Sequence, residues 1–248
     1  MNGNELASEL TRAFPGAPGD LHRLHARLAA AAQRDGILDV AYRTVDSPVG
    51  PLLLAATEAG LVRVAYASED HDAVLQALAD RISPRVLDAP ARLDAAAREL
   101  GEYFTGRRHS FDLPLDWRLS AGFRRAVLSH LTEIGYGHTA SYAAVARLAG
   151  NPKAVRAAAT ACATNPLPVI VPCHRVIYSD GRIGRYLGGP DAKRALLAVE
   201  AAARAAPQPR EPPHRSTRAA PPGRCGGIGS TRSSGAPSAR TSTATAAP

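Results

Sequence analysis

Three adjacent residues, Cys173, His174 and Arg175, carry side chains that could perform nucleophilic chemistry together. A thiolate is a strong nucleophile, an imidazole can take its proton, and a neighbouring cation favours the thiolate over the thiol. The apolar run at 169–171 predicts a buried strand, and Pro172 ends that strand because proline has no N–H to donate to a sheet. Cys173 would then lie at the tip of a rigid element, where a nucleophile is held in a fixed position.

The same cysteine has a simpler interpretation as a small buried hydrophobic residue, which is the usual role of an unpaired cysteine. Its setting between a proline and a His-Arg pair favours the nucleophile more than an average cysteine does. Residue types and spacing alone leave both interpretations open.

The elements around this stretch predict a helix–turn–helix. Ser120 is a candidate cap for a helix whose apolar residues recur from Phe123 to Ile134, and Ser141 caps a short helix that runs to Leu148. A turn at Gly150-Asn151 then leads into a second helix over 153–163.

The second helix of this motif is unusually poor in side-chain bulk. Pro152 is expected in its first turn, where proline is tolerated, and Arg156 is followed by Ala157-Ala158-Ala159-Thr160-Ala161. Such a strip lets the helix backbone approach a flat partner closely, or lets the helix pack tightly in its own core. Composition does not decide between the two.

The first half of the chain predicts a small α+β unit. A helix is expected over 20–35, where Leu21, Leu24 and Leu28 share one face, and the pattern then changes to the period of strands. The predicted strands are 38–45, 51–57 and 60–67, and the predicted helices after them are 70–81 and 91–105.

Charge divides the chain into regions with different partners. Residues 1–117 have 12 basic and 17 acidic side chains, and residues 118–206 have 12 basic and 4 acidic. Residues 207–248 have 6 Arg and one Glu, with eight Pro and five Gly. We therefore expect an N-terminal extension (1–36), an acidic lobe (37–117), a basic lobe that meets a polyanion (118–206), and a disordered basic tail (207–248).

Several classes of protein are excluded by composition. Three cysteines are too few for a disulfide framework, and no cluster has the four-ligand spacing of structural zinc, so no metal is expected. No apolar run approaches 18 residues and no signal peptide is visible, so we expect a cytoplasmic protein without a membrane partner.

The stretch Pro172-Cys173-His174-Arg175-Val176 resembles the active-site signature of the O6-alkylguanine-DNA alkyltransferases, or methylated-DNA–protein-cysteine methyltransferases. The resemblance covers roughly residues 118–206 and reaches back weakly to residues 47–52. The other matching blocks are Ser141-Tyr142, Ala149-Gly150-Asn151-Pro152, Arg156-Ala157, Asn165-Pro166, Tyr186 with Gly188-Gly189, and Leu196-Leu197 ahead of Glu200.

The resemblance implies a fold and a reaction. The fold is a ribonuclease-H-like first lobe with a short antiparallel sheet, followed by a mainly helical, winged-helix-like lobe. The reaction is the single-turnover transfer of an alkyl group from O6-alkylguanine, with O4-methylthymine a second possible substrate, to the protein's own cysteine. The implied partner is double-stranded DNA, the implied state is a monomer, and no cofactor is implied.

The catalytic residues implied by the resemblance are four. Cys173 accepts the alkyl group, His174 takes the thiol proton through a water molecule, and Glu200 orients the imidazole. Asn165 bridges this relay and the preceding turn. From the residues alone, Glu200 fits an exposed helix face, and Asn165 fits an ordinary Asn-Pro turn.

The DNA-binding residues follow from the same resemblance. Arg156 takes the place of the base that is flipped out, and Ala157 belongs to a recognition helix in the minor groove. Tyr142 crowds the phosphate of the target nucleotide, although from the residues alone it also fits a half-buried tyrosine at a helix start. Lys153 and Arg175 are expected to contact DNA as cations.

The substrate pocket is implied to contain Tyr186, which hydrogen-bonds the base, with Val176 and Pro168 in its wall. Arg185 departs from the family pattern, in which this position is commonly glycine or another small residue. A long cation there could narrow the pocket or contact phosphate.

Three rival functions make different predictions. Alkyltransferase-like proteins, which bind alkylated DNA without repairing it, lack the acceptor cysteine that this chain has as Cys173. A transcription factor would read bases with long polar side chains, and the 157–161 segment offers none. A cysteine hydrolase would need oxyanion donors that the sequence does not reveal.

Overall fold

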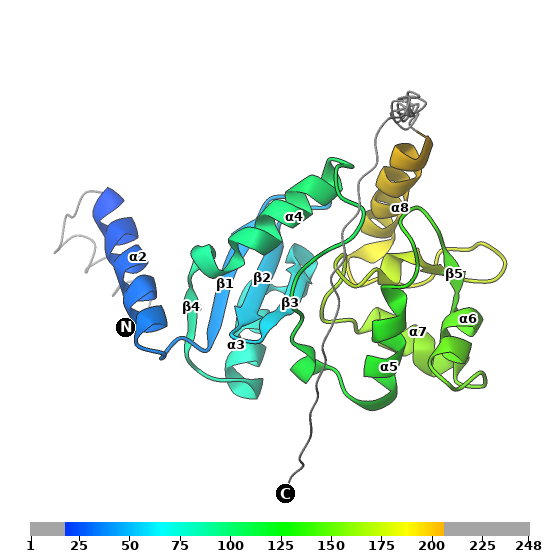
Figure 1. Cartoon of the computed structure of the whole chain (residues 1–248), viewed down its shortest axis with the longest axis horizontal. Helices are drawn as coiled ribbons and strands as arrows, with labels where there is room; N and C mark the ends of the chain where they lie inside the picture. The colour runs from blue at the N-terminus through cyan, green and yellow to red at the C-terminus, as the bar shows by residue number, and fades with distance from the viewer. Residues whose placement is uncertain (1–17, 206–248) are drawn as a thin grey trace, which may run out of the picture. The chain divides into compact units, whose positions relative to one another are not determined.

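A computed structural model describes residues 18–205 of the chain (Figure 1). The predicted tail, with Cys225, and residues 1–17 lie outside the described residues. The first part contains α2 (Pro18–Arg34), β1 (Val40–Val45), β2 (Leu52–Thr57), β3 (Gly60–Tyr66), α3 (His71–Arg81), β4 (Val86–Asp88) and α4 (Asp94–Phe104). The second part contains α5 (Gly122–Leu131), β5 (Ala140–Ser141), α6 (Tyr142–Leu148), α7 (Val155–Ala163), β6 (Val176–Ile177) and α8 (Gly189–Ala205).

The four strands of the first part form one sheet in the order β3-β2-β1-β4. β1 pairs antiparallel with β2, and β2 pairs antiparallel with β3, as the predicted meander requires. β4 pairs parallel with β1, because α3 carries the chain back before β4 begins. The predicted antiparallel sheet is thus confirmed for β1, β2 and β3, and β4 is an additional parallel edge strand.

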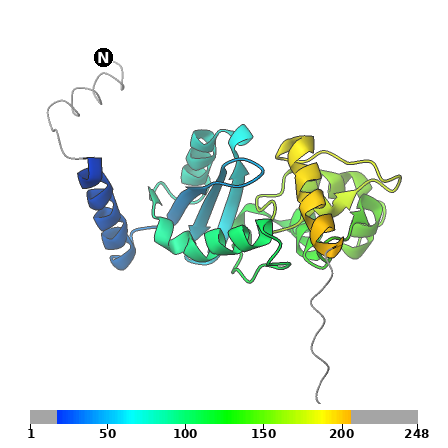
Figure 2. The same ribbon diagram turned by 90° about the horizontal axis from the view of Figure 1, so that it is seen from above.

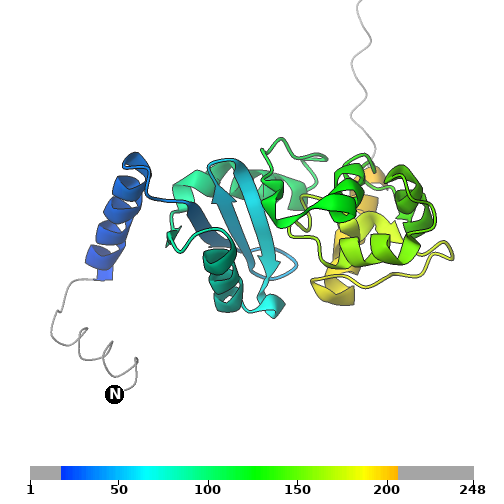
Figure 3. The same ribbon diagram turned by 90° about the horizontal axis from the view of Figure 1, so that it is seen from below.

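The two helices that follow the meander cover opposite faces of this sheet, as Figures 2 and 3 show from two sides. Leu53 and Ala55 of β2 pack in one buried cluster with Val74 and Leu78 of α3. The alternate residues of β2 face the other way, into a cluster with Leu100 of α4. All six residues of β2 are buried, which explains why this strand reads as a nearly continuous apolar run.

The helical lobe has the predicted helix–turn–helix with shifted ends. Ser141 caps α6 by accepting a hydrogen bond from the N–H of Ala144, as expected. Two details differ from prediction: Ala121 rather than Ser120 precedes α5, and α7 begins at Val155. Pro152 thus lies in the turn before α7, where the N–H of Ala154 donates to the carbonyl of Asn151.

The predicted buried strand at 169–171 is absent, and a compact turn takes its place. The N–H of Val171 donates to the carbonyl of Leu167, and Val169 has a left-handed φ of 72°. A strand is disfavoured here because Pro166, Pro168 and Pro172 remove N–H donors on both sides of the run. The apolar residues are nevertheless buried, so the pattern predicted their burial correctly and their conformation wrongly.

The turn also joins the two lobes. The N–H of Val64 in β3 donates to the carbonyl of Pro166 over 2.8 Å, which occupies part of the open edge of the sheet. One buried cluster extends from the α4 face of the sheet through α5, α6 and α7 to Cys173. Among residues 18–205, no helix is long and apolar enough to cross a membrane.

Candidate active site

Cys173 follows the proline-rich turn and begins a single turn of 3-10 helix, Cys173–Arg175. Its side chain is buried, with 1% of the residue exposed, and its N–H donates to the carbonyl of Val171 over 2.8 Å. β6 follows at once and pairs with β5 directly before α6. The cysteine is therefore connected on both sides to rigid backbone, although a turn and not a strand positions it.

Asn165 joins the cysteine to this turn. Its side-chain amide donates to Sγ of Cys173 at 3.1 Å and to the carbonyl of Val171 at 2.8 Å, while its oxygen accepts from the N–H of Leu167. A donor held against sulfur stabilises the thiolate more than the thiol.

Lys193 of α8 is a second group near the sulfur, and sequence reasoning missed it. It is fully buried, and its ammonium donates to the carbonyl of Val176 over 2.5 Å. The ammonium also lies 5.9 Å from the centre of the Tyr142 ring. Burial lowers the pKa of Lys193, and the positive charge in turn favours the thiolate of Cys173.

The environment of Cys173 favours the thiol over the thiolate. Burial raises the pKa of Cys173 to about 11, although the Asn165 hydrogen bond and the Lys193 charge oppose the rise. The groups that favour the thiolate here are Asn165 and Lys193, rather than the adjacent His174 and Arg175. A base must take the thiol proton before the sulfur can attack.

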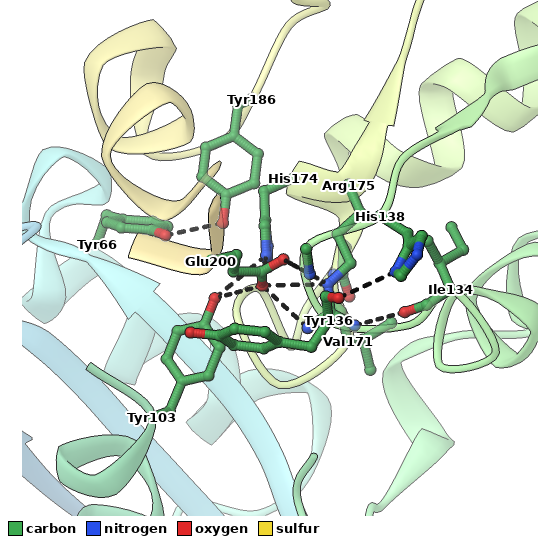
Figure 4. A network of polar contacts seen from close by, with 12 residues as sticks. Tyr66, Tyr103, Ile134, Tyr136, His138, Val171, His174, Arg175, Tyr186 and Glu200 are labelled. Atoms are coloured by element: carbon green, nitrogen blue, oxygen red, sulfur yellow. Dashed lines mark hydrogen bonds and ion pairs between the residues drawn. The ribbon is translucent and has the colours of Figure 1, made fainter. Parts of the chain in front are cut away.

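His174 and Glu200 form a fully buried pair in which Nε2 of the imidazole lies 2.8 Å from Oε1 of the carboxylate (Figure 4). The geometry places the imidazole proton on Nε2, because a carboxylate can only accept. Nδ1 of His174 then carries the free lone pair, and among residues 18–205 it has no hydrogen-bond partner. Burial lowers the pKa of His174, which keeps the imidazole neutral and able to accept a proton.

Glu200 is held by more groups than the imidazole. Tyr103 of α4 donates its hydroxyl to Oε1 over 2.7 Å, and the Gly137 N–H donates to Oε2 over 2.9 Å. Burial alone would raise the pKa of Glu200, but the hydrogen bonds from His174 and Arg175 outweigh it and lower the pKa to about 2. The carboxylate is therefore ionised at neutral pH.

Arg175 contradicts its predicted role as a DNA contact. Its guanidinium is buried and directs Nε and one terminal nitrogen to Glu200, over 2.9–3.1 Å, while the other nitrogen donates to the carbonyl of Ile134. A buried carboxylate needs a charged partner of this kind, and Arg175 supplies it. The pair leaves no cation here to meet a phosphate.

A cavity of about 500 Å³ opens between α7 and the 178–187 segment. Tyr142, Arg185 and Tyr186 line it, and Arg185 is exposed. The other residues that line it are Ala159, Thr160, Ala163, Thr164, Tyr178 and Leu187. Val176 and Pro168 are buried and do not line this cavity.

Gly184 packs directly against the ring of Tyr142. A Cβ at Gly184 would lie 2.2 Å from the Tyr142 hydroxyl, so only glycine lets the segment pass so close to the ring. Tyr142 is 4% exposed, more buried than a tyrosine at a helix start would need to be.

The alanine strip of α7 has a buried side and an exposed side. Ala158 and Ala161 are buried against the lobe, whereas Arg156, Ala157 and Thr160 are exposed. Lys153 is also exposed in the turn that leads to α7. The outward face thus combines a cation with small side chains.

Two residues of this site escaped sequence reasoning for different reasons. Lys193 lies seven residues before Glu200, two turns along one helix, so its position on the same face was a usable signal. Tyr103 lies in the first lobe at the spacing of an ordinary core residue, and no local pattern connects its hydroxyl with Glu200. No group of three or more metal-ligating side chains occurs within the part of the chain that the structure describes.

Comparison with known proteins agrees with this architecture. Residues 40–117 match the ribonuclease-like domain of 6-O-methylguanine DNA methyltransferase, and residues 122–202 match its DNA binding domain. Over 161 residues the chain is 38% identical to a methylated-DNA–protein-cysteine methyltransferase of Mycolicibacterium paratuberculosis, which covers 65% of this chain and 92% of that protein.

Solved structures give the same result. The crystal structure of Mycobacterium tuberculosis O6-methylguanine methyltransferase has a TM-score of 0.60 at 36% identity, covering 68% of this chain and 96% of that one. The structure of Mycobacterium tuberculosis OGT in complex with DNA has a TM-score of 0.56 at 37% identity, covering 66% and 94%. The expected ribonuclease-like lobe and helical DNA-binding lobe are thereby confirmed, and the chain belongs to the methylated-DNA–protein-cysteine methyltransferase family.

Proposed function

We propose that this protein repairs O6-alkylguanine in double-stranded DNA by moving the alkyl group to Sγ of Cys173. Membership of the family carries the reaction type, transfer from DNA to a protein cysteine. The observation that carries the choice of Cys173 is the Asn165 amide 3.1 Å from its sulfur, together with the nearby buried charge of Lys193. The other described cysteine, Cys162, is buried, and burial raises its pKa as well.

The chemistry balances as a proton transfer followed by a displacement. The thiol proton passes through a water molecule to Nδ1 of His174, while Glu200 stabilises the imidazolium that forms. The thiolate attacks the alkyl carbon, an S–C bond forms, and the bond between that carbon and O6 breaks. Guanine leaves with the electron pair and takes up the proton that the His174 imidazolium gives back, and the thioether remains on the protein.

The base must leave the duplex to reach a buried sulfur, at a cost of a few kcal/mol of unstacking. The exposed Arg156 is suited to fill the vacated stack, and the small exposed Ala157 lets α7 enter a minor groove. Lys153 is suited to contact phosphate, and Tyr142 at the cavity is suited to crowd the target nucleotide.

The extruded base would enter the cavity that Tyr186 lines, and the Tyr186 hydroxyl is the group suited to hydrogen-bond it. Val176 and Pro168 lie deeper, and contact between them and the base would require the cavity to extend inward on binding. Arg185 is on the cavity surface, where its charge favours a phosphate neighbour and its length restricts bulky alkyl groups.

A thioether is not reversed by this site, so each protein molecule acts once and needs no cofactor. Because one chain provides the acceptor cysteine and the cavity for one extruded base, a monomer is sufficient for the reaction. Because an acceptor cysteine must stay reduced, we place the protein in the reducing cytoplasm.

The experiment is a titration of the protein with excess duplex DNA that carries a labelled methyl group on O6 of one guanine. The expected plateau is one methyl group per protein molecule, with unmodified guanine restored in the DNA. Uptake of several groups per molecule, or release of the base from DNA, would overturn the proposal. Cys162→Ala is the matched control and should reach the same plateau.

A further inference from the structure

Tyr66, the last residue of β3, extends from the first lobe to the pocket tyrosine of the second lobe. Its hydroxyl lies 2.8 Å from the hydroxyl of Tyr186, as Figure 4 shows, and the two rings meet edge to face with centres 5.8 Å apart. Tyr66 is 2% exposed and Tyr186 is 8% exposed, so water is largely excluded from this contact.

The surrounding chain is shaped to hold Tyr66 in this position. A Cβ at Gly188 would lie 2.7 Å from the Tyr66 ring, so glycine leaves the space that the ring occupies. At the other end of the residue, the Tyr66 N–H donates to the Glu69 carboxylate over 2.9 Å, and Arg63 pairs with the same carboxylate. Backbone and ring are therefore both fixed.

The number of protons limits what the two hydroxyls can do. Each has one proton, and among residues 18–205 the only hydrogen-bond partner of the Tyr66 hydroxyl is the hydroxyl of Tyr186. Tyr186 also lines the cavity. If Tyr186 donates to Tyr66, its proton points away from the cavity; if Tyr66 donates, the proton of Tyr186 is free to point into it.

We propose that Tyr66 is a positioning residue for alkyl transfer: it donates to the Tyr186 oxygen and thereby directs the Tyr186 proton to the extruded base. This proposal rests on the proposed function. No covalent bond forms or breaks at either tyrosine. As guanine leaves with the electron pair, the hydrogen bond from Tyr186 to the base strengthens, and the bond that Tyr66 donates polarises the Tyr186 hydroxyl further.

The protonation of the two phenols agrees with this arrangement. Burial raises the pKa of both Tyr66 and Tyr186 well above the ordinary value, so both keep their protons at neutral pH. A donor chain from Tyr66 through Tyr186 is therefore available whenever the base is present.

The test is a double-mutant cycle with Tyr66→Phe, Tyr186→Phe and the double variant, in which DNA affinity and the rate of the transfer step are measured separately. Loss of one hydrogen bond in a chain corresponds to a slowing of roughly threefold to tenfold. We expect Tyr66→Phe to slow transfer by that factor in the wild-type background, with unchanged DNA affinity. In the Tyr186→Phe background, the same substitution should have no further effect.

The matched control is Tyr42→Phe, which removes a hydroxyl from β1, where Tyr42 packs with the other buried cluster of the sheet. It should leave the transfer rate unchanged. A purely structural role for Tyr66 predicts equal slowing in both Tyr186 backgrounds, or weaker DNA binding, and either result would overturn the proposal. If the wild-type protein takes up no methyl group, the proposed function has failed instead.

Gly188→Ala is the second variant, because it displaces the Tyr66 ring without removing a hydroxyl. It should slow transfer as Tyr66→Phe does, and it should again have no effect once Tyr186 is phenylalanine. Additive slowing with Tyr186→Phe would overturn the proposal.

Discussion

Two regions of the molecule differ in how they hold their charged side chains. One is the buried polar cluster of Tyr103, His174, Arg175 and Glu200, and the other is the exposed face of α7. In the cluster, Glu200 is fully buried and bonds to three side chains, so its charge is tied to the stability of the fold. On α7, Arg156 is exposed next to small side chains. If the proposed function is correct, substitutions in the interior should change both stability and the transfer step, whereas substitutions on the exposed face of α7 should change only the reaction with duplex DNA.

The largest effect is expected in the interior, from Glu200→Gln. The substitution leaves the Arg175 guanidinium buried without a counter-charge and weakens His174 as a base. Breaking a buried ion pair from one side typically costs about 3–5 kcal/mol of stability. We expect a loss of that size in urea unfolding, with alkyl transfer nearly abolished.

Glu133→Gln is the matched control for that substitution, because Glu133 pairs with His130 at the surface. Exposed pairs contribute at most about 1 kcal/mol. If the two variants lose equal stability, the contrast between interior and surface is wrong.

The second effect concerns pH. The native protein keeps the Cys173 proton up to about pH 11, whereas an unfolded thiol loses its proton near pH 8.5. Unfolding therefore releases a proton between these values, and the free energy of unfolding falls as the pH rises through this window. Between pH 7.5 and pH 10, the free energy of unfolding should fall by about 2 kcal/mol more in the wild type than in Cys173→Ala. Denaturant unfolding of both proteins at pH 7.5 and pH 10 measures this difference. An equal fall in the free energy of unfolding of the two proteins would contradict the raised pKa of Cys173.

The third effect is that of Lys193→Met. Removal of the buried cation raises the pKa of Cys173 further, and one unit of rise lowers the thiolate fraction at neutral pH about tenfold. We expect transfer to slow by a similar factor at unchanged DNA affinity. Arg194→Met, which removes an exposed cation one residue along the helix, is the control. If both variants slow transfer equally, the burial of the Lys193 charge near Cys173 is not what promotes the reaction.

The smallest effect on the fold should come from Arg156→Ala. As a surface substitution it should change stability by no more than about 0.5 kcal/mol. Repair in duplex DNA should slow several-fold, whereas reaction with free O6-methylguanine, which needs no base extrusion, should not. Equal slowing with both substrates would assign Arg156 to the structure of α7 instead.

The same two regions differ in how far the sequence predicted them. The exposed face followed from local patterns, because helix spacing and small side chains determine what α7 can present. The cluster was found only in part. Cys173, His174 and Asn165 are close in sequence and Glu200 follows from the family signature, but Tyr103 and Tyr66 come from the other lobe. Their roles depend on how the lobes pack, which periodicity cannot predict.

Errors of conformation had local physical causes. The apolar 169–171 run was predicted as a strand, and the flanking prolines, which cannot donate to a sheet, make it a turn. Arg175 was assigned to DNA on the basis of its charge, and the need of Glu200 for a buried partner directs it inward. In both cases the residue type alone did not show which hydrogen bonds or ion pairs the surrounding structure requires.

Peptide mass spectrometry after incubation with duplex DNA that contains O6-methylguanine tests the central claim most directly. We expect one added methyl group, located on the peptide that contains Cys173, and none on the peptide that contains Cys162. An unmodified Cys173, or a methyl group on Cys162, would contradict it.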